Sequence, residues 1–502
     1  MDAAFLSGID ALRRAGRMEE AIAGLRARVE ATPRDPAAWA ALADTLAAAN
    51  RPDLALDAWE RANGLAKPSG AMLCGKARAL QSLGRPGEAA ASFAAAAALD
   101  PESFDAGYGL VMLAFEAGNL DLATTHMARL QAAHGDHPGA IWLAARLSLA
   151  RGEFGRARDL TRRLLASPGL EVAGRADALL LQGEVLDRLG DYSLAFAAAR
   201  EGKAIQRRLF AGRAAGHESE TAKLRRLLAW FQATDPGPWK IAPPPGTSGA
   251  EGHVFLLGFP RSGTTLLEQG LAGHPRVVAL EEAPTLADPN QEFLRDDAGL
   301  ARLARLGVGE AKVWRGRYWQ AVRDHGIEPR GKVLVDKAPA GTLNLPLIAK
   351  LFPEAKVLFA VRDPRDVVLS CAMNAFQMNA LTYAFTDLTD AAGCYSACMA
   401  LAEIYRALFT LEVMEVRHEA LVEDFPSQLA GIAAFVGLSF DPAMTDIAAT
   451  ALSRPVRTPS AVQVRAGLNR RGLGRWRAYA AELASVRGAL EPWVERFGYP
   501  AD

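Results

Sequence analysis

The sequence has 502 residues, of which half are hydrophobic and 23% are charged, as in an ordinary globular protein. A chain of this length exceeds one compact core, so we expect two or more domains. Lys plus Arg and Asp plus Glu number 57 each, for a net charge of zero. The net charge therefore gives no indication of a nucleic-acid or membrane partner. Any anion-binding site must be formed by a local cluster of basic residues.

The N-terminal stretch MDAAFLSGIDALRRAG has no basic segment followed by an apolar one, and the chain has no long apolar run. Neither a signal peptide nor a transmembrane helix is therefore expected. The four cysteines have no His close by in the sequence, so we expect no zinc site, and so few thiols favour a reducing compartment. We expect a soluble, cytoplasmic protein.

A short pattern recurs within residues 1–232, namely a Gly or Asn followed five residues later by an Ala. It begins at residues 16, 50, 84, 118, 152 and 190, so the first four steps are equal and the last step is longer by four. A left-handed Gly ends one helix, and the small Ala lets the next helix pack close to it. Asp35 and Asp100, each followed by Pro, are predicted N-caps. The last step predicts an insertion in the last unit.

A helix-turn-helix unit that repeats with this constant period resembles the tetratricopeptide repeat, whose unit is about 34 residues long. Trp39, Leu42 and Ala43 stand where the first helix of that family carries its Trp, Leu and small residue. The resemblance implies an all-α helical array with a concave surface for a peptide or protein. A scaffold that positions the second domain, or joins two copies as a homodimer, is the equal alternative.

The segment 233–252 is rich in Pro and Gly and is predicted to be a linker. From 253 to 502 the pattern changes to apolar runs at 254–258, 333–337, 356–363 and 411–419, separated by helical segments. The last run could instead continue the preceding helix. This alternation predicts an α/β domain with a parallel sheet, whose ligands bind at the carboxyl ends of the strands.

The stretch GFPRSGTT, residues 258–265, follows the first of these strands and opens a helix. Such a turn can hold a phosphate through backbone amides, hydroxyls and one guanidinium group. Thr264 stands where the ordinary P-loop has its Lys, so a P-loop kinase is disfavoured. The predicted anion-binding residues of this turn are Arg261, Ser262, Gly263, Thr264, Thr265 and Leu266.

Two further strand ends carry positive charge. Lys337 could supply the charge that the turn lacks, and Arg362, with Ser370 eight residues later, could hold a second phosphate. With these motifs, residues 254–480 resemble sulfotransferases that use 3′-phosphoadenosine 5′-phosphosulfate (PAPS), and most of all the tyrosylprotein sulfotransferase branch. The P-loop-like turn would then hold the 5′-phosphosulfate and Arg362 with Ser370 the 3′-phosphate.

The same resemblance implies further site residues. The stretches RTPSAVQVR and GRWRAY are similar to the family's C-terminal cofactor loop, which implies Ser460, Arg465 and Arg475 as cofactor contacts. In HPRVVALEEAPTL the family's general base corresponds to Glu282, with Glu281 as the alternative.

Lys337 would stabilise the bridging oxygen and Arg261 the sulfuryl oxygens, with no metal. The branch usually carries an Arg where this chain has Pro284, which leaves the acceptor hydroxyl open among protein tyrosine, glycan, lipid and small molecule. The alternative function is a repeat scaffold with a non-catalytic nucleotide-binding domain. His418 is expected to brace a turn or lie exposed.

Overall fold

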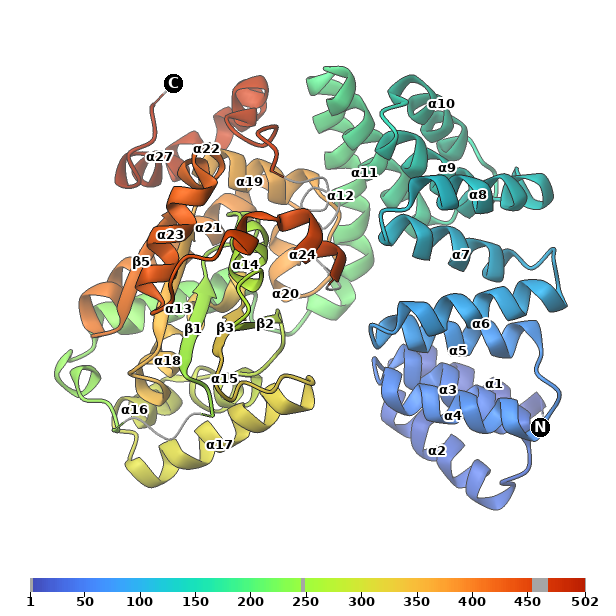
Figure 1. The fold of residues 1–502 in the computed structure, drawn as a ribbon, viewed down its shortest axis with the longest axis horizontal. Coiled ribbons are helices and arrows are strands. Elements are labelled where there is room, and N and C mark those ends of the chain that lie inside the picture. Colours follow the sequence, from blue (N-terminus) through green and yellow to red (C-terminus); the bar gives the residue numbers. More distant parts are fainter. Residues whose placement is uncertain (1–2, 245–248, 454–467, 502) are drawn as a thin grey trace. The chain divides into compact units, whose positions relative to one another are not determined.

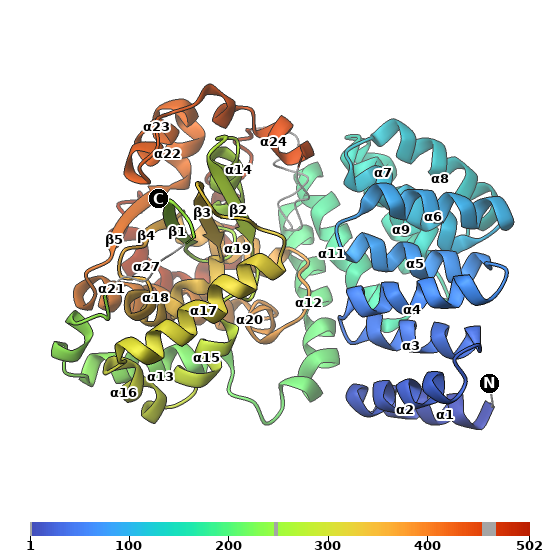
Figure 2. The ribbon, with the colours of Figure 1, turned by 60° about the horizontal axis from the view of Figure 1, so that its bottom comes forward.

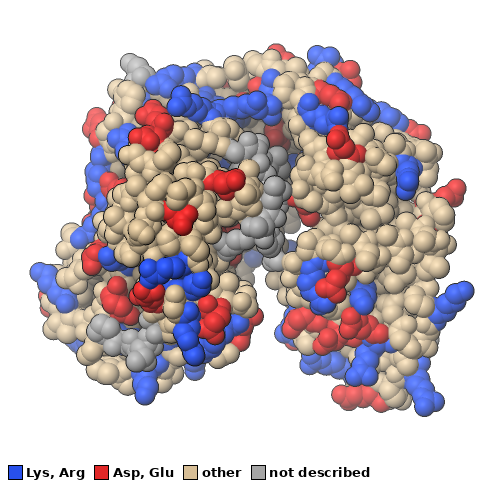
Figure 3. Space-filling model, viewed as in Figure 1, with Lys and Arg blue, Asp and Glu red and all other residues tan. Residues whose placement is uncertain are grey.

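The computed structural model describes residues 3–244, 249–453 and 468–501. It divides into two compact units, residues 1–170 and 171–502, and each is described by itself. Basic and acidic side chains are interspersed on the visible face of each unit (Figure 3). No helix among the described residues has the length and apolar character needed to cross a membrane.

The first unit is a stack of antiparallel helix pairs (Figure 1). Its helices are α1 (Ala3–Arg14), α2 (Met18–Ala31), α3 (Pro36–Ala48), α4 (Pro52–Leu65), α5 (Gly70–Ser82), α6 (Pro86–Leu99), α7 (Phe104–Glu116), α8 (Leu120–His134), α9 (Pro138–Ala150) and α10 (Phe154–Leu165).

The repeat pattern is confirmed at every turn. All six leading residues adopt the left-handed conformation that the pattern requires, with φ between 58° and 87°. The six alanines five residues on are all 0% exposed. These alanines are Ala21, Ala55, Ala89, Ala123, Ala157 and Ala195.

One of the two predicted N-caps is correct. Asp35 accepts a hydrogen bond from the amide of Ala37 and caps α3. The prediction for Asp100 is wrong, because this residue forms the C-cap of α6. Ser103 caps α7 instead, and its hydroxyl accepts from the amide of Ala106 at 3.5 Å.

The longer last step of the repeat lengthens one helix. The helix α11 (Val172–Leu189) begins one ordinary repeat step after α9, but it has 18 residues where α9 has 13. The insertion therefore adds a turn at the carboxyl end of α11, which includes Asp187.

The second unit contains α11, α12 (Tyr192–Ala214) and α13 (Glu220–Ala233), which pack on the helices of an α/β domain. Within the described residues five parallel strands form one sheet in the order β2-β3-β1-β4-β5. The strands are β1 (Gly252–Leu257), β2 (Val277–Glu281), β3 (Val333–Lys337), β4 (Lys356–Val361) and β5 (Glu412–Arg417). The sequence predicted all of these except β2, a short edge strand whose polar end obscured the pattern.

The remaining helices of the second unit surround this sheet. The α-helices are α14 (Thr264–Ala272), α15 (Ala287–Phe293), α16 (Asp297–Ala304), α17 (Val308–Asp324), α18 (Leu345–Leu351), α19 (Pro364–Met373), α20 (Ala380–Ala384), α21 (Leu388–Leu408), α22 (His418–Glu423), α23 (Phe425–Phe435), α24 (Ile447–Ser453), α26 (Ala480–Leu483) and α27 (Arg487–Arg496). The 3₁₀ turns are η1 (Gly237–Lys240), η2 (Pro339–Asn344), η3 (Pro442–Thr445), η4 (Arg475–Tyr479) and η5 (Ala484–Val486).

Helices cover both faces of the sheet. Figure 2 shows α14 and α23 on one side and α17 and α18 on the other. Successive residues of β1 alternate between the two cores, with Phe255 and Leu257 facing the α17 side and Val254 and Leu256 the α14 side. Because the strands are parallel, their carboxyl ends meet at one edge, where Glu282, Lys337 and Arg362 lie.

The predicted linker is anchored where the structure describes it. Trp239 in η1 is 3% exposed. The ammonium of Lys350 donates to the carbonyls of Pro238 and Ile241, and Arg315 donates to those of Pro243 and Pro244. The described part of this segment is therefore packed on the α/β domain.

Candidate active site

The turn after β1 brings its backbone close to neighbouring residues. Gly258, Arg261 and Gly263 all have positive φ, at 153°, 74° and 96°. A Cβ on Gly263 would lie 2.3 Å from Nδ1 of His418, so the turn requires glycine at this position. Gly263 is the N-cap of α14. The amides of the first turn of α14, which have no intrahelical acceptors, therefore lie at this turn and suit an anion.

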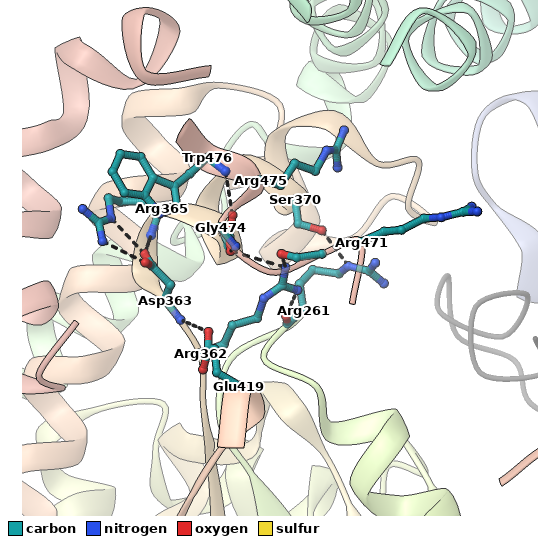
Figure 4. A network of polar contacts seen from close by, with 12 residues as sticks. Arg261, Arg362, Asp363, Arg365, Ser370, Glu419, Arg471, Gly474, Arg475 and Trp476 are labelled. Atoms are coloured by element: carbon teal, nitrogen blue, oxygen red, sulfur yellow. Dashed lines mark hydrogen bonds and ion pairs between the residues drawn. The ribbon is translucent and has the colours of Figure 1, made fainter. Parts of the chain in front are cut away.

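The structure brings the two predicted anion motifs together. Nε of Arg261 donates to the hydroxyl of Ser370 at 2.9 Å, and Nη1 of Arg362 donates to the carbonyl of Arg261 at 3.1 Å (Figure 4). Ser370 lies on α19, far along the chain from the turn. The side chains that were predicted to hold two separate phosphates thus form one contact network at the sheet edge.

Positive charge is concentrated in this network. Burial, and then the charge of Arg362, lowers the pKa of Arg261 to about 10. Nε of Arg362 is buried and has no hydrogen-bond partner among the described residues. The nearest carboxylate to Arg362, that of Asp366, lies 3.8 Å away. A bound anion would supply the missing charge and hydrogen-bond acceptors.

Asp366 holds the C-terminal segment against this network. Its carboxylate accepts from the amides of Gly474 and Trp476, each at 2.7 Å. Burial raises the pKa of Asp366 to about 6, although Arg362 acts in the opposite direction. The predicted residues Ser460 and Arg465 lie outside the described residues, whereas Arg475 is placed beside the network (Figure 4).

Arg475 is held by α11, a contact that the sequence did not predict. Oδ1 of Asp187 accepts from Nε of Arg475 at 3.0 Å and from the hydroxyl of Tyr479 at 2.6 Å. Asp187 lies in the turn that the insertion adds to α11. The longer last step of the repeat was therefore the sequence feature that could have drawn attention to this residue. Arg188 in the same turn has a pKa lowered by burial and by Arg471, so further guanidinium groups lie here.

A second cluster surrounds Lys337 at the end of β3. Its ammonium lies 2.8 Å from Glu282, 3.3 Å from Glu281 and 3.4 Å from Glu268. Burial lowers the pKa of Lys337, but the three carboxylates, Glu268 first, outweigh burial and raise it. Lys337 is therefore a fully buried cation. Glu268, on α14, was not predicted from the sequence as a site residue. The sequence feature that could have indicated it is a single acidic residue in the otherwise uncharged stretch TTLLEQ.

The three carboxylates differ in exposure. The side chain of Glu268 is 1% exposed and that of Glu281 is 15% exposed, whereas that of Glu282 is 48% exposed. Glu282 follows β2 with a φ of 49°, and its amide donates to the carbonyl of Lys337 at 2.8 Å. Glu282 is thus the carboxylate that a molecule outside the cluster can reach.

His418 opens α22, directly after β5, and is a half-buried residue that lies against the turn. Burial, and then Arg362 and Arg261, lowers its pKa to about 3. Its Nδ1 is buried without a partner among the described residues. The site therefore combines a cationic anion-binding network, a neutral imidazole and an accessible carboxylate paired with a buried lysine.

Two protein families match parts of the chain. Residues 253–442 match the sulfotransferase family, and residues 6–63 and 74–141 match the tetratricopeptide repeat family. The chain is 28% identical over 262 residues to an uncharacterized protein of Aquifex aeolicus, a match that covers 49% of this chain and 33% of that protein.

Two further similarities each cover less than half of the chain. It is 26% identical over 265 residues to protein-tyrosine sulfotransferase A of Caenorhabditis elegans, which covers 49% of this chain and 67% of that protein. The crystal structure of PilW, a type IV pilus biogenesis factor, aligns with 41% of this chain and 94% of its own at a TM-score of 0.36 and 21% identity. The chain thus spans only a third of the first relative's length.

Proposed function

Since the chain carries tetratricopeptide repeats and a C-terminal domain of the sulfotransferase family, we propose that it transfers a sulfuryl group from PAPS to a hydroxyl acceptor. One observation carries this proposal. Two anion motifs that lie far apart in the sequence meet through the hydrogen bonds of Arg261 with Ser370 and of Arg362 with the Arg261 carbonyl. A donor with separate 5′ and 3′ phosphates requires such a pair of adjoining sites.

The residues present fit this donor. The 5′-phosphosulfate would lie on Arg261, Ser262, Gly263, Thr264, Thr265 and Leu266. The 3′-phosphate would lie on Arg362 and Ser370, where the unpartnered Nε of Arg362 needs an acceptor. Arg475 would add charge from η4, and Ser460 and Arg465 remain proposed contacts. PAPS supplies the sulfuryl group and leaves as the bisphosphate PAP.

Glu282 would act as the general base. It takes the proton of the acceptor hydroxyl as the new oxygen–sulfur bond forms and the bond between sulfur and the bridging phosphate oxygen breaks. Its greater exposure supports Glu282 over Glu281 for this role. Lys337 would stabilise the negative charge on the bridging oxygen, and Arg261 the charge on the sulfuryl oxygens.

The repeats and the relatives suggest the partners. A tetratricopeptide array commonly binds a peptide or protein, and we assign the repeat surface that role. The name of the Caenorhabditis elegans relative makes protein tyrosine one candidate acceptor. A homodimer and a cytoplasmic location remain predictions.

Calorimetric titration with PAP and with ATP-magnesium tests the donor. The wild type should bind PAP far more tightly than ATP, and Arg362→Ala should weaken PAP binding by about ten- to a hundredfold, because a charge-assisted phosphate contact is lost. Arg295→Ala is the control, since Arg295 is exposed and pairs with its neighbour Asp296. Equal affinity for PAP and ATP would rule the proposal out.

Labelled PAPS tests the chemistry. Glu282→Gln should keep its PAP affinity and lose transfer of the label to hydroxyl acceptors by at least a hundredfold, the range of general-base catalysis. A wild type that binds PAP but transfers no label to any hydroxyl acceptor would favour the alternative function, a scaffold with a non-catalytic nucleotide site.

A further inference from the structure

The hydroxyl of Ser370 lies in the last turn of α19 and has two close neighbours. Ser370 is 6% exposed, and its Oγ lies 2.9 Å from Nε of Arg261 (Figure 4). Nδ2 of Asn374, the C-cap residue of α19, lies 3.0 Å from the same oxygen. The hydroxyl is thus held between the turn that follows β1 and the end of its own helix.

The side-chain amide of Asn374 can take only one of its two orientations. It lies 2.7 Å from the carbonyl oxygen of Ser370, and a carbonyl oxygen can only accept a hydrogen bond. If the oxygen and the nitrogen of the amide were exchanged, two acceptors would face each other. The amide therefore presents its NH₂ group, and the second hydrogen of that group is available to Oγ.

Both neighbours of Oγ are therefore donors that cannot accept. The Nε of a guanidinium group and the NH₂ of an amide carry hydrogens, whereas a hydroxyl oxygen accepts two hydrogen bonds and donates one. Arg261 and Asn374 together fill both lone pairs of Oγ. The proton of the Ser370 hydroxyl must point away from both groups, and no described residue accepts it. It is left for an acceptor such as a phosphate oxygen.

Asn374 also covers the carbonyl of Ser370. Carbonyl groups at the carboxyl end of a helix carry partial negative charge, which repels an anion. Asn374 donates to this carbonyl twice, from its backbone amide at 3.1 Å and from Nδ2 at 2.7 Å. It therefore lowers the repulsion that a phosphate at the Ser370 hydroxyl would meet.

We propose that Asn374 is a positioning residue for the 3′-phosphate of the donor. Together with Arg261 it fills the lone pairs of Ser370 Oγ, leaves the hydroxyl proton to the phosphate, and so helps to select a bisphosphorylated nucleotide over one with a 5′-phosphate alone. This inference rests on the proposed PAPS donor. Asn374 acts through Ser370, and its effect is one of orientation, since no proton is transferred.

Adenosine 5′-monophosphate (AMP) is the probe that tests this role, because it differs from PAP only in lacking the 3′-phosphate. Asn374→Leu removes the donor and keeps a side chain of similar size, so the hydroxyl regains its other rotamers. In calorimetric titrations of the full chain, the ratio of PAP affinity to AMP affinity should fall about three- to tenfold, with AMP affinity unchanged. Asn374→Asp should lower this ratio about thirtyfold, because a carboxylate draws the hydroxyl proton toward itself.

A double-variant cycle shows whether the effect passes through Ser370. In Ser370→Ala there is no hydroxyl to orient, so adding Asn374→Leu should leave the ratio of affinities unchanged. If Asn374 only stabilised the end of α19, its loss would lower the ratio in both backgrounds or weaken PAP and AMP alike, and either result would overturn the proposal. Gln377→Leu is the matched control, an amide-to-leucine change at an exposed position three residues further on, and should keep the ratio.

The possible outcomes separate this inference from the proposed function. A wild type that prefers PAP to AMP, with the same preference in Asn374→Leu, would overturn the role of Asn374 and leave the donor proposal intact. Equal affinity of the wild type for PAP and AMP would overturn the 3′-phosphate site and this inference with it. A preference that falls in Asn374→Leu would support the inference even if no sulfuryl group were transferred.

Discussion

Replacing Lys337 by methionine should show how much the ion pairs of the buried Lys337 cluster contribute to the free energy of unfolding. The substitution keeps the length of the side chain and removes a cation that lies within 3.4 Å of three carboxylates. Breaking a buried ion pair costs about 3–5 kcal/mol, because an uncompensated charge is left behind. Glu268 and Glu281 account for most of this cost, whereas the half-exposed Glu282 adds no more than about 1 kcal/mol.

The assay is urea denaturation of Lys337→Met at pH 8, beside the wild type. The raised pKa of Lys337 means that its contribution is complete below about pH 10.4 and is lost only as the pH rises through the higher folded value, so it is fully present at pH 8. The free energy of unfolding should fall by about 3–5 kcal/mol. Adding Glu268→Gln should restore part of the loss.

Lys312→Met is the control, because Lys312 is exposed on α17 and should change stability by less than about 0.5 kcal/mol. A loss below about 1 kcal/mol in Lys337→Met, or no recovery in the double variant, would refute this account of the cluster.

Three further substitutions test other contacts. Asp187→Ala frees the arginine and tyrosine that it holds and should lower PAP affinity several-fold in calorimetry, and unchanged affinity would contradict the role of α11. Gly263→Ala, with φ at 96° and a contact to His418, should lose PAP affinity at least tenfold, while the unobstructed Gly309→Ala should not. Burial raises the pKa of Asp336 to about 6, so its contribution to wild-type stability falls as the pH rises from about 4 to about 6. Asp336→Asn should reduce that fall, to which Asp366 also contributes, and should gain up to about 3 kcal/mol at pH 8 in urea denaturation.

The features that the sequence predicted are local ones. The left-handed turns at the start of each repeat depend on one residue and its neighbours, so the constant period of the repeat predicted them without knowledge of the rest of the chain. The turn around Gly263 and the strands β1, β3 and β4 are likewise encoded in short stretches with clear apolar patterns. The Asp100 prediction failed because two cap signals competed within four residues, and Ser103 lay closer to the helix.

Other site residues became visible only through the tertiary structure. The charge pattern of α14 does not predict that Glu268 faces Lys337. That of α11 does not predict that Asp187 pairs with Arg475. Both contacts depend on strand order and helix packing. The same holds for the hydroxyl of Ser370, because its contact with Arg261 depends on how α19 packs against the turn after β1.

The sequence by itself therefore determined the repeat array, the anion-binding turn and the residue types of the site. The fold decided which carboxylates share one lysine and which helix positions the C-terminal arginine. The physical reason is the range of the forces involved. Backbone conformation and amphipathic period depend on residues close in the sequence, whereas burial and charge pairing depend on groups that only the folded chain brings together.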